Sequence, residues 1–292
     1  MSAARALART NPAPSIKRRR DGSSPWITIG LYGSACLTLF LPLLVAFLWS
    51  VVDPQTGWFA PDIVPRSLSL HHWEDALGDP SIIRSIVLSL LISTVVTFLT
   101  GILALPTAFA LAKIPFRWKR TVEIFILAPL IVPGIIIGIG VGTLFLRMGL
   151  AYTVIGVILV QTIGTLPFMI RILAATLEAI PNDLLHAART LGATPLKLAR
   201  HILVPLAWPG FIAGGLLSFI RSFEEFDKTF IVGAPIVQTI TVKLWAFLGG
   251  KIIIFPNAAV LTFILVMPML VIFFLAERFL REDVLAAGMG KL

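Results

Sequence analysis

The sequence predicts an all-α membrane protein with six transmembrane helices. Of its 292 residues, 57% are hydrophobic and only 13% are charged, whereas a soluble domain has about 25% charged residues. Apolar stretches without Asp, Glu, Lys or Arg recur along the chain, and each is long enough to cross a hydrocarbon core of roughly 30 Å as a helix. The basic residues gather between alternate stretches, which predicts an orientation in the membrane.

Six stretches reach the length of about 20 apolar residues that one helical span requires. They cover residues 26–52, 85–112, 124–146, 148–170, 202–220 and 252–276. A seventh apolar stretch, 229–242, is only 14 residues long and is interrupted by Gly233, Ala234 and Pro235. We therefore expect that stretch to form a re-entrant or interfacial segment and not a span.

The distribution of Lys and Arg predicts that both termini are cytoplasmic. With that orientation the inner segments are 1–25, 113–123, 171–201 and 277–292, and they hold 17 of the 24 basic residues. Positively charged loops stay in the cytoplasm, so the reverse orientation is disfavoured. The basic run at 17–20 could also begin a secretory signal peptide, but the apolar stretch after it is longer than the 7–15 residues that are typical of one. We therefore expect an uncleaved first span.

The predicted organisation is one membrane domain, 25–282, between two short tails. Residues 1–24 are rich in Ala, Arg, Ser and Pro, a composition typical of a disordered segment, and 283–292 form the second tail. The formal net charge of +9 would suggest nucleic-acid binding in a soluble protein. Here the charges lie between the spans, so topology explains them and we expect no nucleic-acid partner. A single cysteine, Cys36, excludes an intramolecular disulfide.

Small residues mark predicted contacts between helices. Gly134, Gly138 and Gly142 form two overlapping GxxxG spacings in the third span, and Gly210 and Gly214 repeat the spacing in the fifth. Such residues let helices approach closely in lipid. The contacts could be static, or they could slide during a functional movement.

Polar residues within and beside the spans indicate two candidate sites. Gln161 lies in the middle of the fourth span, where a polar side chain faces either a solute path or a hydrogen-bonding partner on another helix. Glu224, Glu225 and Asp227 gather just beyond the fifth span, where they would attract an organic cation. Phe223 and Phe226 flank the two glutamates and could add cation–π contacts. In the alternative interpretation this is a solvated loop whose acids are neutralised by Arg221 and Lys228.

No catalytic, cofactor or metal site is predicted. The sequence contains no HExxH, GxSxG or GxxxxGK[ST] motif. A pump driven by ATP would therefore need its nucleotide-binding subunit on another chain. The predicted spans also lack charged residues, which are usual in proton- or sodium-coupled carriers, and this argues against a secondary carrier or channel that acts alone.

The stretch 182–200, between the fourth and fifth spans, carries several helix-boundary signals. Asn182 or Asp183 can cap a short helix, and Gly192 can end it in the left-handed conformation. Thr194 followed by Pro195 is typical of a second helix start. We expect two short helices that form a compact cytoplasmic projection. Its two alanines, Ala187 and Ala188, leave a flank on which another protein can dock closely.

This loop resembles the signature of permeases from binding-protein-dependent ATP-binding-cassette importers of type I. The signature is Glu-Ala-Ala, three residues, Gly, nine residues, and Ile-x-Leu-Pro. The matching residues are Ala187, Ala188, Gly192, Ile202 and Pro205. His186 stands where the signature has Glu, and Val204 stands where it has Leu. The resemblance extends over about residues 80–282.

The resemblance implies the type I importer permease fold in a bacterial inner membrane. It assigns ATPase coupling to the loop, through His186 and the five matching residues. It also implies as partners two ATPase subunits, a second permease subunit that we expect to be a different chain, and a periplasmic solute-binding protein. The chain itself would then be a transporter subunit and not an enzyme.

Within that family the sequence most resembles spermidine/putrescine-type polyamine permeases. The resemblance is carried by 166–168, 218–219, 222–226, 233–235 and 257–258, although those relatives often have two aspartates where this chain has Glu224 and Glu225. It implies import of a polyamine or a related amine. The candidate substrate path comprises Gln161, Ser218, Ser222, Phe223, Glu224, Glu225 and Asp227. Alternatives are an amino-acid-like solute, a phosphonate or an opine, and, outside this class, a lone carrier or a membrane scaffold.

Overall fold

The computed structural model describes residues 25–249 and 254–289, so the predicted tail 1–24 lies outside the described residues. The chain divides into two units, 1–46 and 47–292. What the structure describes of the first unit is one apolar helix, the greater part of α1 (Pro25–Ser50). Its side chains are mostly exposed within that unit, including Leu31, Tyr32 and Phe40. A helix with so many exposed apolar side chains suits a lipid surrounding.

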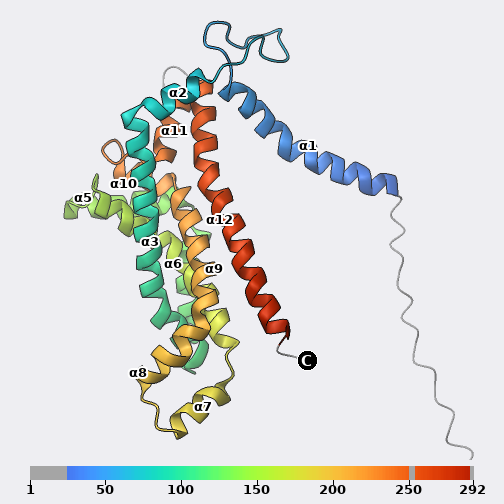
Figure 1. Cartoon of the computed structure of the whole chain (residues 1–292). Helices are drawn as coiled ribbons and strands as arrows, with labels where there is room; N and C mark the ends of the chain where they lie inside the picture. Colours follow the sequence, from blue (N-terminus) through green and yellow to red (C-terminus); the bar gives the residue numbers. More distant parts are fainter. Residues whose placement is uncertain (1–24, 250–253, 290–292) are drawn as a thin grey trace, which may run out of the picture. The chain divides into compact units, whose positions relative to one another are not determined.

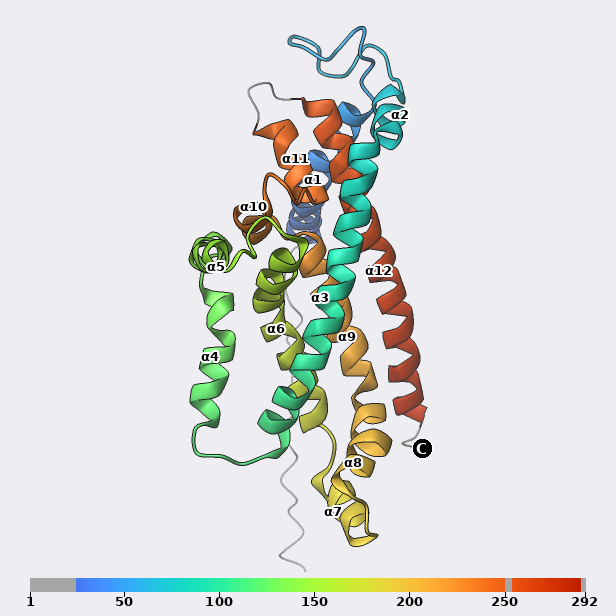
Figure 2. The ribbon, with the colours of Figure 1, turned by 90° about the vertical axis from the view of Figure 1, so that its left-hand side faces the viewer.

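The second unit is a bundle built around three long helices. These are α3 (Pro80–Lys113), α6 (Val154–Glu178) and α9 (Val204–Phe223), which pack against one another, with α12 (Phe255–Met289) beside α9 (Figures 1 and 2). In the described part of the chain five helices are long and apolar enough to cross a membrane, or six if one bent pair is counted as a single span. The predicted all-α architecture is confirmed.

The bent pair corrects one prediction from the sequence. Instead of a single helix over 124–146, the structure has α4 (Lys119–Ile131) and α5 (Gly134–Met148), which meet at an angle of 100°. Figure 2 shows α4 running along the bundle and α5 end-on across it. Pro133 causes the break, because it has no N–H to donate and it disfavours a helical conformation for Val132, whose φ and ψ are −79° and 128°.

The glycines of α5 allow a close contact with α10 (Asp227–Gly233). A Cβ atom added to Gly138 or Gly142 would lie 3.3 Å from the side chain of Ile231. In α9, a Cβ at Gly214 would lie 2.5 Å from Met169 Sδ on α6. Both sets of small residues therefore lie at helix contacts, as their spacing predicted.

The predicted re-entrant or interfacial stretch, 229–242, contributes to two short helices. They are α10 and α11 (Ile240–Leu248), and neither meets the length that a membrane span requires. The backbone N–H of Ile240 donates to Ser89 Oγ at 2.8 Å, which attaches the start of α11 to α3. This stretch therefore folds back onto the bundle.

A short cap covers the end of the bundle that carries α11. It consists of residues 51–70 and α2 (His71–Gly78), whose Ala76 is buried against α12. Burial lowers the pKa of His72 in this cap, and the neighbouring His71 acts in the same direction. Asp75 and Asn257 act in the opposite direction but are weaker.

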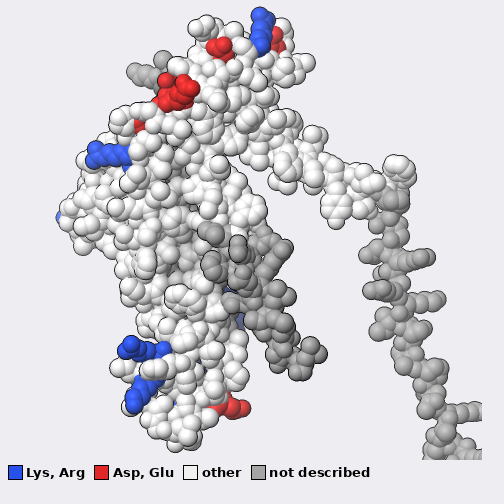
Figure 3. Space-filling model, viewed as in Figure 1, with Lys and Arg blue, Asp and Glu red and all other residues white. Residues whose placement is uncertain are grey.

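The opposite end of this unit carries α7 (Asn182–Thr190) and α8 (Pro195–Leu198) (Figures 1 and 2). The connection between α3 and α4 lies at the same end (Figure 2). On the face in Figure 3, blue Lys and Arg side chains gather over the α8 region, and the surface between the two ends is largely uncharged. Residues 182–200, which the sequence places inside, thus lie at one end of the bundle, and the loop and α2 between the first two predicted spans lie at the other. Which end faces the cytoplasm remains a prediction.

Candidate functional site

The helix α7 ends in a Schellman motif centred on Gly192. Gly192 has φ = +79°, its N–H donates to the carbonyl of Arg189 at 3.0 Å, and the N–H of Ala193 donates to the carbonyl of Ala188 at 3.0 Å. The predicted left-handed helix end is therefore confirmed. The predicted start of the second helix is also confirmed, because Thr194 Oγ1 accepts from the N–H of Lys197 at 3.4 Å and Pro195 is the first residue of α8.

The start of α7 differs from the prediction. Neither Asn182 nor Asp183 caps the helix, because the chain turns at Pro181 and Asn182 is already helical. The Asn182 side chain instead accepts a hydrogen bond from Lys113 Nζ at 3.1 Å, and the same ammonium donates to the carbonyl of Ile180 at 2.5 Å. One lysine at the end of α3 thereby holds the start of the loop in place.

One face of the α7–α8 loop is anchored in the core, and the other is free. Leu185 and Leu198 are buried in a cluster with Leu173 and Leu177 of α6. The large apolar side chains on the opposite face are exposed, with Leu191 at 88% and Leu196 at 78%. We call this exposed face, which comprises Leu184, His186, Ala187, Leu191 and Leu196, the coupling surface, after the role that the resemblance in sequence implies for it. Apolar residues gathered on a polar end of a molecule are typical of a protein interface.

The signature residues divide between the two faces of this loop. His186 and Ala187 are exposed, whereas Ala188 and Ile202 pack against the buried cluster. Pro205 stands at the start of α9, directly after a turn of π-helix, Ala199–Leu203. We did not predict this turn, although Pro205 was a signal for it, because a residue without an N–H weakens the regular helical ladder.

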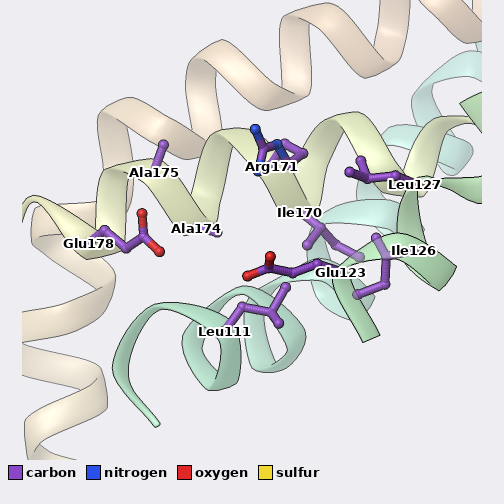
Figure 4. A pocket seen from close by; sticks show the side chains of 9 residues that line it. All are labelled: Leu111, Glu123, Ile126, Leu127, Ile170, Arg171, Ala174, Ala175 and Glu178. Atoms are coloured by element: carbon purple, nitrogen blue, oxygen red, sulfur yellow. The ribbon is translucent and has the colours of Figure 1, made fainter. Parts of the chain in front are cut away.

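A small cavity of about 150 Å³ lies near this end, between α3, α4 and α6. The carboxylates of Glu123 and Glu178 extend toward each other from α4 and α6 (Figure 4). Lys119 Nζ lies 4.0 Å from Glu123 and 3.8 Å from Glu178, so it links the two helices. These groups are partly exposed, and such pairs contribute little free energy.

A larger cavity of about 510 Å³, which we call the charged cavity, lies at the break between α4 and α5. Its wall comes from three places: the break itself, the middle of α6, and the turn from α9 into α10. The lining residues used below are Gly134, Gly164, Thr165, Phe168, Arg221, Glu225, Asp227 and Lys228. A neighbouring hollow of about 260 Å³ shares Arg221, Glu225 and Asp227 with it and adds Glu224 and Phe226.

Two of the acids beside the charged cavity are paired, and one is not. Arg221 Nη1 donates to Glu224 at 2.7 Å, and Lys228 Nζ donates to Glu225. Among the described residues, Asp227 has neither an ion pair nor a hydrogen bond to its carboxylate. Two cations and three carboxylates thus leave the group with one net negative charge.

The sequence places Lys228 in an outer loop, whereas the structure buries it beside the middle of α6. The residue is 7% exposed. A Cβ atom at Gly164 would lie 2.8 Å from Lys228 Cε, and one at Gly134 would lie 3.4 Å from its Nζ. Glycines on two helices, α5 and α6, therefore leave room for this side chain. Charged residues buried beside a membrane span often belong to functional sites. A search for stretches without charged residues could not have found this pair.

Comparison with known proteins connects these features to a family. The chain matches the model of the binding-protein-dependent transport system inner membrane component over residues 101–282. It belongs to this family. The chain is therefore the permease subunit of an ATP-binding-cassette importer, a multi-pass inner-membrane component and not an enzyme.

Individual relatives are distant but cover most of the permease. It is 26% identical to the sulfate transport system permease protein CysT of Salmonella typhimurium, over 89% of this chain and 96% of that protein. It is 32% identical to the molybdenum transport system permease protein ModB of Mycobacterium bovis, over 51% and 61% of the two chains. A bacterial transporter that imports the acidic polysaccharide alginate shares the fold, with a TM-score of 0.70, 17% identity, and coverage of 87% and 95%.

Two of the predicted path residues of the permease form a buried polar contact between helices. Ser222 Oγ of α9 donates to Gln161 Oε1 at 2.5 Å, and Gln161 Nε2 of α6 donates to Thr229 Oγ1 of α10 at 2.7 Å. Gln161 is 1% exposed. Gln161 was expected either to face a solute path or to hydrogen-bond to another helix. This geometry supports the hydrogen bonding between helices. Ser218 is also buried, and its hydroxyl has no partner among the described residues.

Of the two phenylalanines expected to flank the glutamates, Phe223 lies away from the charged cavity and Phe226 lines the neighbouring hollow. Phe223 is 1% exposed and stacks on Phe219 at 5.8 Å, so it does not line the cavity. Phe226 stacks on Phe230 at 5.2 Å and lies tilted against Trp245 at 5.5 Å. The ring that does line the charged cavity is Phe168, where the guanidinium of Arg221 lies 5.3 Å from the ring centre. Of the predicted acids, Glu225 and Asp227 line the cavity and Glu224 lies beside it.

Proposed function

We propose that this permease imports a polyamine or a related amine-bearing solute through the charged cavity. The observation that carries the proposal is the carboxylate of Asp227, which lines the cavity without a counter-charge among the described residues. Together with Glu224 of the neighbouring hollow, the charged groups around the cavity carry one net negative charge, which raises the local concentration of a cation and repels an anion.

In this proposal the permease works within a larger assembly. It pairs with a second permease subunit, expected to be a different chain; the assembly contains two ATPase subunits, one of which docks at the coupling surface of this chain. A periplasmic solute-binding protein delivers the solute at the end that carries α2 and α11. The exposed Leu191 and Leu196 support docking at the coupling surface, since they are apolar and anchored by buried neighbours. We also propose that the α7–α8 end and both termini are cytoplasmic.

A second candidate solute is an oxyanion. The relatives named above are sulfate and molybdenum permeases, and Arg221 and Lys228 line the charged cavity. Each of these cations already has a carboxylate partner, however, so an anion would have to displace Glu224 or Glu225. The charged group that has no partner among the described residues is the carboxylate of Asp227, and a carboxylate favours an amine over an oxyanion as the solute.

The test is uptake by the assembled importer in proteoliposomes. We expect uptake of radiolabelled putrescine and spermidine, and we expect Asp227→Asn to raise the half-saturating concentration about tenfold, equivalent to ~1.4 kcal/mol. Glu123→Gln is the control, since it removes an acid of α4 that lines the small cavity and not the charged cavity, away from the end that carries α2 and α11. Import of sulfate or molybdate with no uptake of either amine would contradict the amine assignment and favour the oxyanion.

A further inference from the structure

The charged cavity contains an ammonium group of the protein's own. Lys228 is buried, and its Nζ donates to one carboxylate oxygen of Glu225. The other oxygen of Glu225 accepts the backbone N–H of Lys228 at 2.9 Å, so both carboxylate oxygens are engaged by one residue. Glu225 is therefore held by Lys228 and has little capacity left for a solute.

Asp227 lies close to the same ammonium but is not bound to it. A Cβ atom at Gly134 would lie 3.0 Å from Asp227 Oδ2 and 3.4 Å from Lys228 Nζ. Both groups thus face the same point on α5, from neighbouring positions on α10. Among the described residues, the cavity wall carries two carboxylates, Glu225 and Asp227, and two cations; Arg221 is paired with Glu224 and Lys228 with Glu225, so Asp227 has no cation of its own.

The glycines around Lys228 make this arrangement possible. Any side chain at Gly164 would meet Lys228 Cε, and one at Gly134 would meet its Nζ. The ammonium can therefore extend along α6 and reach Glu225 without leaving the cavity wall. A flexible four-carbon stem also lets it withdraw when another cation takes its place.

We propose that Lys228 is a tethered ammonium that fills one of two carboxylate positions and thereby sets how many positive charges of a solute the cavity accepts. With Lys228 in place, one ammonium group of the solute binds, at Asp227. Without it, Glu225 and Asp227 together bind two. This inference rests on the proposed amine substrate and deepens it, because it names the residue that determines the charge of the preferred solute.

The test compares two solutes of similar length that differ by one charge. Putrescine has two ammonium groups, and 4-amino-1-butanol has one. Equilibrium binding of both is measured on the purified permease–ATPase complex in nanodiscs without the binding protein, so that the selectivity of that protein does not enter. We expect Lys228→Met to tighten putrescine binding about tenfold relative to 4-amino-1-butanol, because the half-buried Glu225 and the exposed Asp227 then both lack a counter-charge.

Three further variants separate the charge effect from a general disturbance. Lys228→Arg keeps the charge, and Lys243→Met removes a lysine of α11 that binds Ser81 outside the cavity; neither should change the ratio of the two affinities. The double variant Glu225→Gln/Lys228→Met removes the whole pair, so it should show the wild-type ratio. If Lys228→Met alone does not fold, Lys228→Gln, which lacks the charge but keeps a polar end, takes its place with the same expected shift.

Each outcome decides the inference. An unchanged ratio in Lys228→Met, with amine binding present in the wild type, overturns it and leaves the proposed function standing. A double variant that shifts the ratio as Lys228→Met does would also overturn it. Diamine binding by Lys228→Met without amine binding by the wild type would support the role of Lys228 and contradict the proposed function. Absence of amine binding in every variant would reject both.

Discussion

At the scale of single residues, Gly192 gives the clearest prediction. Its φ of +79° is a conformation that side chains disfavour, and it lies beside the exposed Leu191 of the coupling surface. Gly192→Asp should cost about 1 kcal/mol of backbone strain, and it should also place a carboxylate where the ATPase docks. We expect a correctly inserted protein whose solute transport falls at least about tenfold in the assembled importer, as measured by uptake.

Gly149→Asp is the matched control for this change. Gly149 also has a positive φ, +70°, with nothing within 4 Å of an added Cβ, but it lies at the end of α5 and away from the coupling surface. It should show a similar loss of thermal stability while solute-stimulated ATP hydrolysis persists. Normal stimulated hydrolysis in Gly192→Asp would contradict the coupling role. His186→Glu should be tolerated, since His186 is exposed and Glu is the signature residue.

At the scale of elements, the packing of α5 depends on one face of glycines. A Cβ at Gly138 would lie 3.3 Å from Ile231 Cβ and 3.4 Å from Lys228 Cα, so a larger side chain would push α10 away. Gly138→Leu should therefore destabilise the protein by about 1–3 kcal/mol, the usual cost of overpacking. The measurement is the thermal unfolding midpoint of the purified protein in detergent.

Gly140→Leu is the control on the same helix. Nothing lies within 4 Å of a Cβ added to Gly140, so the same substitution two positions away meets open space. Its unfolding midpoint should remain near that of the wild type. Equal midpoints for the two variants would mean that α5 does not rely on this contact, and that the α4–α5 break has another support.

At the scale of the whole molecule, the topology is open to a direct test. In a Cys36→Ser background, Ile63→Cys and Leu191→Cys place single thiols at sites that are 89% and 88% exposed, at opposite ends of the 47–289 bundle. We expect a membrane-impermeant thiol reagent to label Ile63→Cys in intact cells, and Leu191→Cys only after permeabilisation, because basic loops stay in the cytoplasm. The opposite pattern would reverse the orientation.

The sequence by itself determined the all-α architecture and the geometry of the α7–α8 loop. Apolar stretches of span length are a local property, because lipid requires each helix to satisfy its own backbone hydrogen bonds. The ends of the loop helices were also readable, since Gly192 and Thr194 act on residues only a few positions away. The same signals could not place Asn182, whose partner Lys113 is 69 residues distant.

Only the tertiary structure decided the bend between α4 and α5 and the composition of the charged cavity. Pro133 signals that the helix breaks. The angle of 100° between α4 and α5, however, accompanies the packing of α5 on α10, which is far away in sequence. Lys228 and Glu225 lie in a segment that reads as an outer loop, yet Gly164 and Gly134 bring them beside the middle of α6. The burial of a charge depends on the neighbours that other elements supply, and neither hydropathy nor periodicity along the chain records those neighbours.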